Sequence, residues 1–313
     1  MPICLPTKEA IIEATKILQE GGVVSFATET VYGLGCDTFN TQAVKKVYAL
    51  KNRPTNNPMI AHILDATWVG RLATGWDNRC EKLAERFWPG PLTIILPKKE
   101  SVPSEACGGF DTVAIRCPAH KTARLLLDSF NNPISAPSAN ISGHISPTTA
   151  NHVEQEFGRD TFILDGGSSE KGIESTVLSM VGTPTILRPG SVTIKELTNC
   201  IGFVATHTGA DQTNSPGTSS RHYAPKTKVV LKTSDAICNI NSDSKIVVYH
   251  TTAPARCKNK IQMPSSPTEY AAKIYSVLRE ADAMGADVIV VELPPTSPEW
   301  LAINDRLNRC CTS

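Results

Sequence analysis

The chain has 313 residues, of which 41% are hydrophobic and 19% are charged. This length suggests two domains, and the composition is that of a folded protein rather than a disordered one. The formal net charge of +1 excludes a strongly basic scaffold for nucleic acids. We find neither a secretory signal nor an apolar run of about 18 residues, so we expect a cytoplasmic protein without a membrane span.

The first two-thirds of the chain combine helical and strand patterns. Apolar spacing predicts helices at 8–19, with Thr7 as the N-cap, and at 41–50. A β-branched run predicts a first strand at 23–26, and later strands are close enough in sequence to pair as antiparallel neighbours. We therefore expect a mixed sheet. The later strands are expected at 92–96, 112–116, 134–136, 161–164, 176–180 and 185–187.

A long polar stretch, THTGADQTNSPGTSS at 206–220, predicts a linker because it is rich in Gly, Ser, Thr and Pro. We place the first domain at 1–205, the linker at 206–225 and the second domain at 226–313. In the second domain, strands expected at 229–231, 246–249 and 288–291 alternate with helices at 268–284 and 300–309. This alternation predicts a small parallel α/β sheet.

The standard signatures of several enzyme classes are absent. The sequence contains no G-x-x-x-x-G-K-[ST], G-x-G-x-x-G, H-E-x-x-H or G-x-S-x-G motif. The seven histidines are too dispersed to form a recognisable metal site, and no Cys-x-x-Cys pair occurs among the ten cysteines. We therefore expect reduced thiols and no metal-ligating residues.

Basic residues stand at the ends of apolar elements, just before proline. Lys51 and Arg53 precede Pro54, Arg116 ends a predicted strand, and Arg188 ends another. Positions i and i+2 of an extended backbone point the same way, so we expect Lys51 and Arg53 to face one anion. The alternative is that these residues are unrelated solvated charges.

Polar groups gather in three further places. After the strand at 134–136, Ser138 and Asn140 are two positions apart, and such groups bind phosphate oxygens or a metal ion, although an ordinary turn has the same composition. The loop at 28–33 follows a strand, which suits a binding role, although an edge strand would also fit. His62 interrupts an apolar run and is either a ligand-binding residue or a satisfied core histidine.

Together these stretches resemble the YrdC-like threonylcarbamoyl-adenylate synthases in their long, two-domain form. Nine segments match in order along almost the whole chain, and Lys51, Arg53, Ser138 and Asn140 meet the family's Lys-x-Arg and Ser-x-Asn signature. The chain departs from the family pattern at Ala27, where proline is usual, and at 217–220, where Gly-Met-Lys-Tyr is usual. The matching segments are FATETVYGLG (26–35), KNRPTNNPMIAHI (51–63), WPGPLT (88–93), DTVAIRCPAH (111–120), APSANISG (136–143), GIESTV (172–177), LRPG (187–190), RHYAP (221–225) and AINDRLNR (302–309).

The resemblance implies an α/β fold in which a YrdC-like twisted mixed sheet with flanking helices precedes a smaller, Rossmann-like domain with a parallel sheet. It implies a nucleotidyltransferase that forms threonylcarbamoyl-AMP and pyrophosphate from L-threonine, bicarbonate and ATP, with Mg²⁺ accompanying the ATP. The product would serve modification of adenosine 37 in tRNA. A separate tRNA threonylcarbamoyl-transferase complex would consume it, so any contact of this chain with tRNA would be weak or indirect.

The family pattern also implies roles for individual residues. The catalytic residues would be Lys51, Arg53, Ser138 and Asn140. L-threonine would be held by Thr28, His62, Arg116 and Ser175, with Arg116 facing the carboxylate. ATP would be held by the four catalytic residues together with Thr112, Ser146, Arg188 and Tyr223, and Tyr223 would close over the nucleotide from the linker.

Three other interpretations compete with this one. The first is a tRNA- or double-stranded-RNA-binding module without chemistry of its own, which the near-neutral charge disfavours. The second is a carbamoyl-transfer domain like those of hydrogenase maturation proteins, which carry zinc-finger segments that this chain lacks. The third is the shorter branch of the family, of uncertain activity, which the intact signature and the second domain disfavour.

Overall fold

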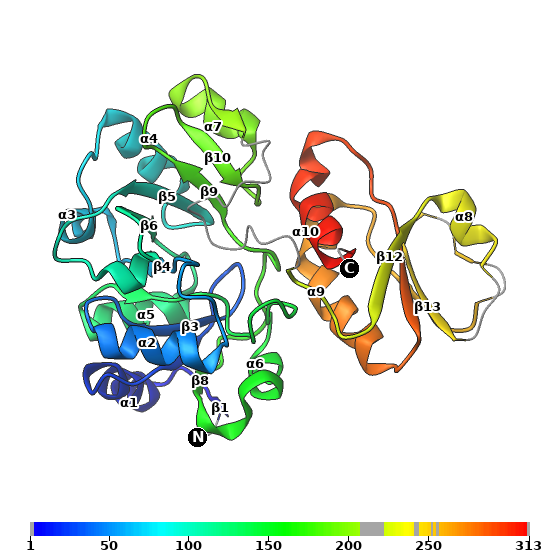
Figure 1. Cartoon of the computed structure of the whole chain (residues 1–313), viewed down its shortest axis with the longest axis horizontal. Helices are drawn as coiled ribbons and strands as arrows, with labels where there is room; N and C mark the ends of the chain where they lie inside the picture. Colours follow the sequence, from blue (N-terminus) through cyan, green and yellow to red (C-terminus); the bar gives the residue numbers. More distant parts are fainter. Residues whose placement is uncertain (1–2, 207–221, 241–243, 252, 255–256, 312–313) are drawn as a thin grey trace.

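The computed structural model describes residues 3–206, 222–240, 244–251, 253–254 and 257–311. These residues form two units, each built on its own sheet (Figure 1). The first sheet has 11 strands of mixed direction and the second has four parallel strands, which confirms the expected fold class. Most of the expected linker, 207–221, lies outside the described residues. No described helix is long and apolar enough to cross a membrane.

The strands of the first sheet are joined in an order that differs from their order in the chain. They are β1 Ile3–Cys4, β2 Val24–Phe26, β3 Gly33–Asp37, β4 Ile60–His62, β5 Leu92–Pro97, β6 Thr112–Arg116, β7 Ile134–Ser135, β8 Phe162–Leu164, β9 Thr176–Ser179, β10 Thr185–Arg188 and β11 Ala205–Thr206. The spatial order is β1-β8-β2-β3-β7-β4-β6-β5-β9-β10-β11. Strands β4 and β6 lie side by side and parallel near the middle of the sheet.

Helices cover both faces of this sheet. They are α1 Lys8–Gln19, α2 Thr41–Leu50, α3 Val69–Leu72, α4 Asn78–Phe87, α5 Lys121–Phe130, α6 Ala150–Phe157 and α7 Ile194–Ile201. Val24 and Phe26 of β2 share a core with α1 and α5. Leu34 and Cys36 of β3 share a second core with α2 and α6. Side chains two positions apart on a strand point to one face, so each strand contributes to the core on that side.

Helix α1 illustrates why the clearest periodic segments were predicted with the correct bounds. The hydroxyl oxygen of Thr7 accepts a hydrogen bond from the backbone N–H of Ala10 at 3.3 Å and caps the first turn. Ile11, Ala14 and Leu18 form the buried stripe. Gly21, with φ of 72°, follows the last turn in a backbone conformation that glycine adopts without strain.

Three elements near the later site were not predicted from the sequence: β3, β4 and α5. Strand β4 has only three residues, Ile60–His62, and its histidine breaks the apolar run. Strand β3 contains two glycines, a residue type depleted in strands. Strand β4 is hydrogen-bonded on both sides to strands that are distant in sequence, and β3 lies between its neighbour β2 and the distant β7.

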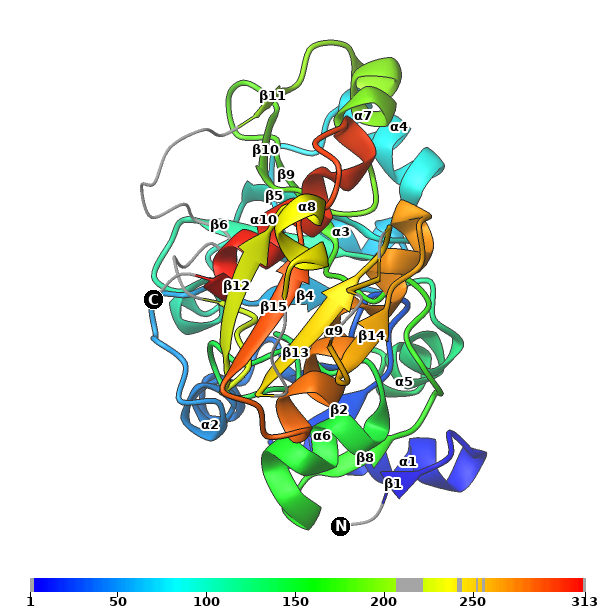
Figure 2. The same ribbon diagram turned by 90° about the vertical axis from the view of Figure 1, so that its right-hand side faces the viewer.

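The second unit is a four-stranded parallel sheet with helices on both sides. Its strands are β12 Lys228–Lys232, β13 Lys245–Tyr249, β14 Lys260–Gln262 and β15 Val288–Glu292, in the order β12-β15-β13-β14. Its helices are α8 Ser234–Cys238, α9 Pro267–Ala283 and α10 Leu301–Cys311. Figure 2 shows this sheet in front of the first unit. Helices α9 and α10 lie on the side of the sheet that faces the first unit, and α8 lies on the outer side (Figure 1).

A shared apolar cluster joins the two units. Val31 and Ile173 of the first unit are in one cluster with Tyr275 of α9 and Leu307 of α10. A Cβ atom placed on Gly172 would lie 2.4 Å from the carbonyl oxygen of Ala271, so the loop at 172 directly contacts α9. The second unit is therefore packed against the first through a hydrophobic core.

Candidate functional site

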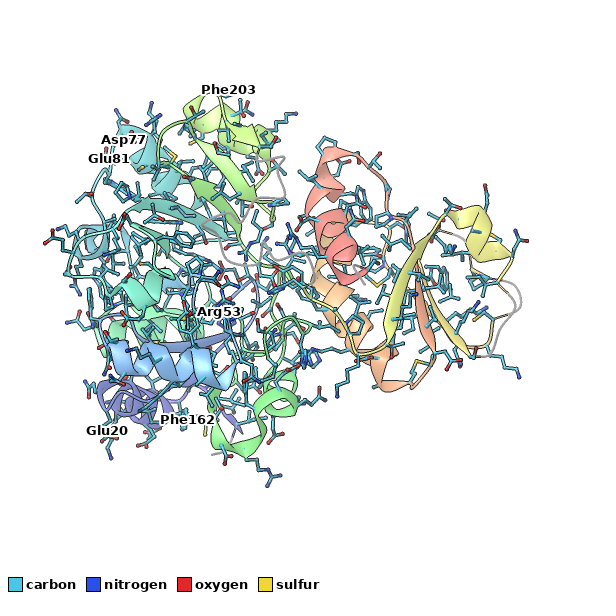
Figure 3. All side chains as sticks on the ribbon, viewed as in Figure 1. Glu20, Arg53, Asp77, Glu81, Phe162 and Phe203 are labelled. Carbon is cyan, nitrogen blue, oxygen red and sulfur yellow. The ribbon has the colours of Figure 1, made fainter. Side chains whose placement is uncertain are left out.

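A pocket opens at the carboxyl ends of β4 and β6, beside the contact with the second unit. Figure 3 labels Arg53, which lines this pocket and is buried, and Phe203, which is exposed at the edge of the first unit. Ligands of open α/β sheets characteristically bind outside the carboxyl ends of strands. Eight of the residues predicted for the site line the pocket: Thr28, Arg53, His62, Arg116, Ser138, Ser175, Arg188 and Tyr223.

The other four predicted residues do not line the pocket. Lys51 and Asn140 lie directly behind its Ser138 wall, and Ser146 lies behind Glu174, to which its hydroxyl donates at 2.6 Å. Thr112 begins β6 and pairs with Pro97, at the opposite end of the strand from Arg116. The structure therefore does not bring Thr112 to the pocket, although the sequence resemblance placed it at the nucleotide.

Arg116 is held in the pocket by a buried ion pair. Its Nη2 donates to Glu29 Oε1 at 2.6 Å, its Nη1 to Thr30 Oγ1 at 2.7 Å and its Nε to the carbonyl oxygen of Gly90 at 3.2 Å. Burial would raise the pKa of Glu29, but the charge of Arg116 and its hydrogen bonds lower it. A guanidinium has five N–H donors, so two remain for a ligand carboxylate. Glu29 thus orients Arg116 without using up its donors.

His62 is a neutral hydrogen-bond acceptor on the pocket side. It pairs with Arg116 across the parallel strands, so both residues emerge at the same end. Its Nδ1 lies 3.1 Å from the carbonyl oxygen of Ile60 and 3.3 Å from that of Ile134. Two acceptors at Nδ1 assign the proton to that atom and leave Nε2 with a lone pair. Burial, and next the charge of Arg116, lower the pKa of His62 to about 3, so the ring is uncharged at neutral pH.

The loop between β2 and β3 presents hydroxyl groups to the same pocket. The hydroxyl of Thr28 donates to the carbonyl oxygen of Val31 at 2.6 Å and accepts the N–H groups of Thr30 and Val31 at 3.2 Å. A side chain that closes its own turn in this way fixes the loop. The sequence alternative of an edge strand is wrong for Thr28, because β3 begins only at Gly33.

The backbone at Lys51 and Arg53 is not extended, which corrects the sequence expectation. Lys51 caps α2 in a helical conformation, and Asn52 has φ of 48°. Asn is one of the few residues that adopt this left-handed conformation readily. The turn sends Lys51 Nζ to the carbonyl oxygens of Ser138, at 2.5 Å, and Asn140. The helix end, rather than strand alternation, therefore brings the Lys-x-Arg segment against the Ser-x-Asn segment.

Lys51 and Arg53 are two buried cations without a carboxylate partner among the described residues. Arg53 donates to the backbone carbonyl oxygens of Asn57 and Pro58, at 3.0 and 2.8 Å, and to Asn57 Oδ1 at 2.6 Å. Burial lowers the pKa of Arg53 to about 10, and burial together with Arg53 lowers the pKa of Lys51 well below its usual value. Buried cations are costly unless they are paired, so this part of the site favours an anion.

Ser175 and Arg188 form another part of the pocket wall. Arg188 ends β10 and donates from Nη2 to the carbonyl oxygen of Ser175 at 2.9 Å and to its hydroxyl at 3.2 Å. The hydroxyl of Ser175 also lies 2.7 Å from that of Thr93. Because β9 and β10 are antiparallel neighbours, the start of one meets the end of the other, and the two residues share a corner of the pocket.

Sequence reasoning missed Glu29, Glu174, His222 and two residues of the second unit, Tyr275 and Arg306. Glu174 accepts hydrogen bonds from Arg306 Nε at 2.8 Å and from the hydroxyl of Tyr275 at 2.9 Å. One available signal was the position of Arg306 on the apolar stripe of α10, where a solvated arginine is not expected. No pattern in the sequence indicates that its partner lies more than 130 residues earlier in the chain.

Three buried polar atoms at the site have no hydrogen-bond partner within the described part of the chain. They are Asn140 Oδ1, the hydroxyl of Tyr223 and Nδ1 of His222. Buried polar groups in folded proteins are almost always hydrogen-bonded. Four further such atoms lie elsewhere in the described residues, but His222 and Tyr223 line the pocket, where a polar ligand would supply the missing partner.

The chain matches two family models and full-length relatives. Residues 16–190 match the Sua5/YciO/YrdC family, described as telomere recombination, and residues 192–312 match the C-terminal domain of threonylcarbamoyl-AMP synthase. The threonylcarbamoyl-AMP synthase of Pyrococcus abyssi is 37% identical, covering 99% of this chain and 97% of that protein. The Bacillus subtilis enzyme of the same name is also 37% identical, covering 95% and 91%.

A solved structure extends the similarity to the fold. The crystal structure of Pyrococcus abyssi Sua5 in complex with L-threonine is 37% identical and superposes with a TM-score of 0.90, covering 96% of this chain and 94% of that one. Both units are therefore included in the likeness. The chain belongs to the threonylcarbamoyl-AMP synthase family, in its long form with a YrdC-like first domain and a smaller second domain.

Proposed function

We propose that this chain forms threonylcarbamoyl-AMP and pyrophosphate from L-threonine, bicarbonate and ATP. The observation that carries the proposal is one pocket with two different ends. One end offers Arg116 and the neutral His62, and the other offers Arg53 and, behind the wall, Lys51. A zwitterionic amino acid suits the first end and a polyphosphate suits the second.

The residues at the first end fit L-threonine. The two remaining N–H donors of Arg116 would bind its carboxylate, and the lone pair of His62 Nε2 would accept a hydrogen bond from its amine or hydroxyl. Ser175 adds a hydroxyl group at the same pocket, and Thr28 lines it while its own hydroxyl closes the loop. The Pyrococcus abyssi protein whose structure contains L-threonine supports this assignment through its similarity.

The residues at the second end fit the triphosphate of ATP. Arg53 and Arg188 supply positive charge at the pocket surface, Lys51 supplies it from behind the wall, and Ser138 adds a hydroxyl group. Asn140 and Ser146 would support this end from behind, because their N–H and O–H donors already bind the carbonyl oxygens of Ile141 and His144 and the carboxylate of Glu174. Proximity to phosphate would restore the pKa that burial lowers in Lys51, because an anion favours the charged form. The hydroxyl of Tyr223, whose pKa burial and Glu174 raise to about 12, would remain a hydrogen-bond donor.

Mg²⁺ would enter as part of the substrate, bound to ATP. Within the described residues, no group of three His, Cys, Asp or Glu side chains is placed to hold a metal ion. Mg²⁺ commonly keeps several waters and binds through substrate phosphates rather than through an all-protein cage. Asn140 Oδ1, a buried oxygen without a hydrogen-bond partner, is the kind of neutral ligand that this ion accepts.

The reaction that fits this site needs positioning and charge rather than a nucleophilic side chain. The threonine ammonium group and bicarbonate give an N-carboxylate with loss of water and one proton. Its oxygen then forms a bond to the α-phosphorus, and the bond from that phosphorus to the pyrophosphate oxygen breaks. The surrounding cations would stabilise the charge that develops on pyrophosphate. Neither His62 nor His222, with pKa values lowered by burial to about 3, is suited to accept a proton at neutral pH, so solvent would take it.

The proposed product is a labile mixed anhydride, and a second enzyme would consume it. We propose a tRNA threonylcarbamoyl-transferase complex in that role, so this chain need not bind tRNA tightly. As a nucleotidyltransferase, the chain would contact only small molecules in its pocket. Its net charge of +1 is consistent with a protein that does not bind tRNA tightly.

Pyrophosphate release tests the proposal. We expect release by the wild-type protein to require L-threonine, bicarbonate and MgATP together. The Arg53→Ala variant should lose it, because Arg53 lines the pocket. ATP-dependent release that continues without threonine or bicarbonate would refute the proposed substrates.

A further inference from the structure

One arginine of the second unit is buried behind the pocket without lining it. Arg306 lies on α10 in the same buried stripe as Ile303 and Leu307, and it is 0% exposed. A buried guanidinium needs partners for its charged donors. Those partners show which parts of the first unit Arg306 holds.

Arg306 contacts three segments of the site. Its Nε donates to Glu174 Oε2 at 2.8 Å, its Nη2 donates to the carbonyl oxygen of Pro189 at 3.0 Å, and its guanidinium lies 5.1 Å from the ring centre of Tyr223. Each segment carries a residue that lines the pocket. Ser175 follows Glu174, Arg188 precedes Pro189, and Tyr223 lines it directly.

Glu174 is fixed from further sides as well. The hydroxyl of Tyr275 on α9 donates to its two carboxylate oxygens at 2.9 and 3.2 Å, and the hydroxyl of Ser146 donates at 2.6 Å. The carboxylate therefore joins helices α9 and α10 of the second unit to Ser146, a residue predicted to bind ATP.

The two wall segments held by Arg306 also contact each other. A Cβ atom placed on Gly190 would lie 2.3 Å from the backbone nitrogen of Thr176 and 2.8 Å from the carbonyl oxygen of Glu174. Such close backbone contact transmits a displacement of one segment to the other. A single side chain from the second unit is thus placed to set the position of the Ser175 and Arg188 corner.

We propose that Arg306 is a positioning residue for substrate binding, acting chiefly through Glu174, with Pro189 and Tyr223 as further contacts. The second unit is then part of the support of the active site rather than an independent module. Asp305 orients the guanidinium through its contact with Nη1 at 2.5 Å. This inference rests on the proposed function for the identity of the substrates.

The test compares kinetic constants of Arg306 variants with their stability. We expect Arg306→Met to raise the KM for L-threonine by roughly tenfold or more, because the Ser175 corner loses its support. Arg306→Lys should recover only part of this loss, since an ammonium lacks the fork that reaches both Glu174 and Pro189. Tyr275→Phe, which keeps the ring and removes one donor to Glu174, should give a smaller rise.

A double variant separates action through Glu174 from simple unfolding. Arg306→Met alone leaves a buried carboxylate uncompensated, whereas Glu174→Gln with Arg306→Met removes both charges. If Arg306 acts through Glu174, adding Arg306→Met to the Glu174→Gln variant should change the KM for L-threonine by less than about threefold. Equal effects of Arg306→Met in both backgrounds would overturn the inference.

Arg279→Met serves as the matched control for contact between the units. Arg279 of α9 also bridges the units, to Glu156 Oε1 at 2.8 Å and to the carbonyl oxygen of Ile145, without touching Glu174. We expect it to lower the Tm with KM unchanged. A Tm loss without a KM change in Arg306→Met, or an equal KM rise in Arg279→Met, would refute the positioning role. If the wild type releases no threonine-dependent pyrophosphate, the proposed function fails, and calorimetric binding of L-threonine still tests Arg306.

Discussion

Replacing Lys51 with methionine should separate the stability of this protein from its capacity to bind nucleotide. Methionine keeps most of the volume of the lysine stem and removes the ammonium. The Lys51 side chain is almost completely buried, and its only contacts through Nζ with described residues are the carbonyl oxygens of Ser138 and Asn140. The free protein therefore carries the cost of a desolvated charge that a bound phosphate would neutralise.

The size of the expected stability change follows from two opposing terms. Two hydrogen bonds from a charged group contribute about 1.5–3 kcal/mol each. Desolvation of a buried ammonium costs several kcal/mol, as the lowered pKa of Lys51 indicates. We therefore expect the free energy of unfolding of Lys51→Met to lie within about 2 kcal/mol of the wild-type value.

The pH dependence has a definite sign. Because the pKa of Lys51 is lower in the folded protein, the unfolded chain binds the extra proton between the two pKa values. Wild-type stability should therefore rise with pH across that interval, and Lys51→Met should remove this contribution.

Nucleotide binding should respond far more strongly. Loss of a buried contact between an ammonium and a phosphate costs about 2–5 kcal/mol, which corresponds to about 30- to 5,000-fold in Kd. Calorimetric titration with MgATP measures the Kd. Urea denaturation measures the free energy of unfolding. The matched control is Lys46→Met on the same helix, where an exposed lysine donates to the carbonyl oxygen of Gly21 at 2.7 Å. A Kd for Lys51→Met within threefold of wild type would refute the reasoning.

The remaining predictions concern the threonine end of the pocket. Glu29→Gln leaves Arg116 without its carboxylate partner, so urea denaturation should show a free energy of unfolding lower by roughly 3–5 kcal/mol. Calorimetry should show a weaker affinity for L-threonine. Unchanged affinity would contradict the orienting role of Glu29. His62, with its pKa lowered to about 3, binds no proton in the folded state at pH 5, whereas the unfolded chain does. Wild-type stability should therefore fall by about 2 kcal/mol per such histidine between pH 7 and pH 5, and a His62→Gln variant that falls equally would contradict this assignment.

The sequence predicted best those elements whose form depends on local patterns. Helix α1 has a capping threonine, a regular apolar stripe and a glycine at its end, and its bounds were predicted correctly. Strand β6 has a continuous apolar run, Val113 to Ile115, and was also predicted with the correct bounds. Strand β4 was missed because three residues carry too little periodicity, and its position depends on β6 and β7 on either side.

In the candidate site, too, local patterns predicted some features, and others depend on tertiary contacts. Lys51 and Arg53 were singled out because the basic residues stand before a proline, yet the contact of Lys51 with Ser138 comes from the end of α2, and a left-handed turn at Asn52 separates the two residues. Glu174 and Arg306 meet only because the second unit docks on the first, and no local pattern contains that information. The pairing of charges across units therefore required the tertiary structure.

The central claim is that the α-phosphorus of ATP receives a carboxylate made from bicarbonate and threonine. Mass spectrometry of the products formed with ¹³C-labelled bicarbonate tests it most directly. We expect pyrophosphate together with an adenylate that contains threonine and is one mass unit heavier than the unlabelled product. Formation of ADP and phosphate, or of a threonine adenylate without the labelled carbon, would contradict the account.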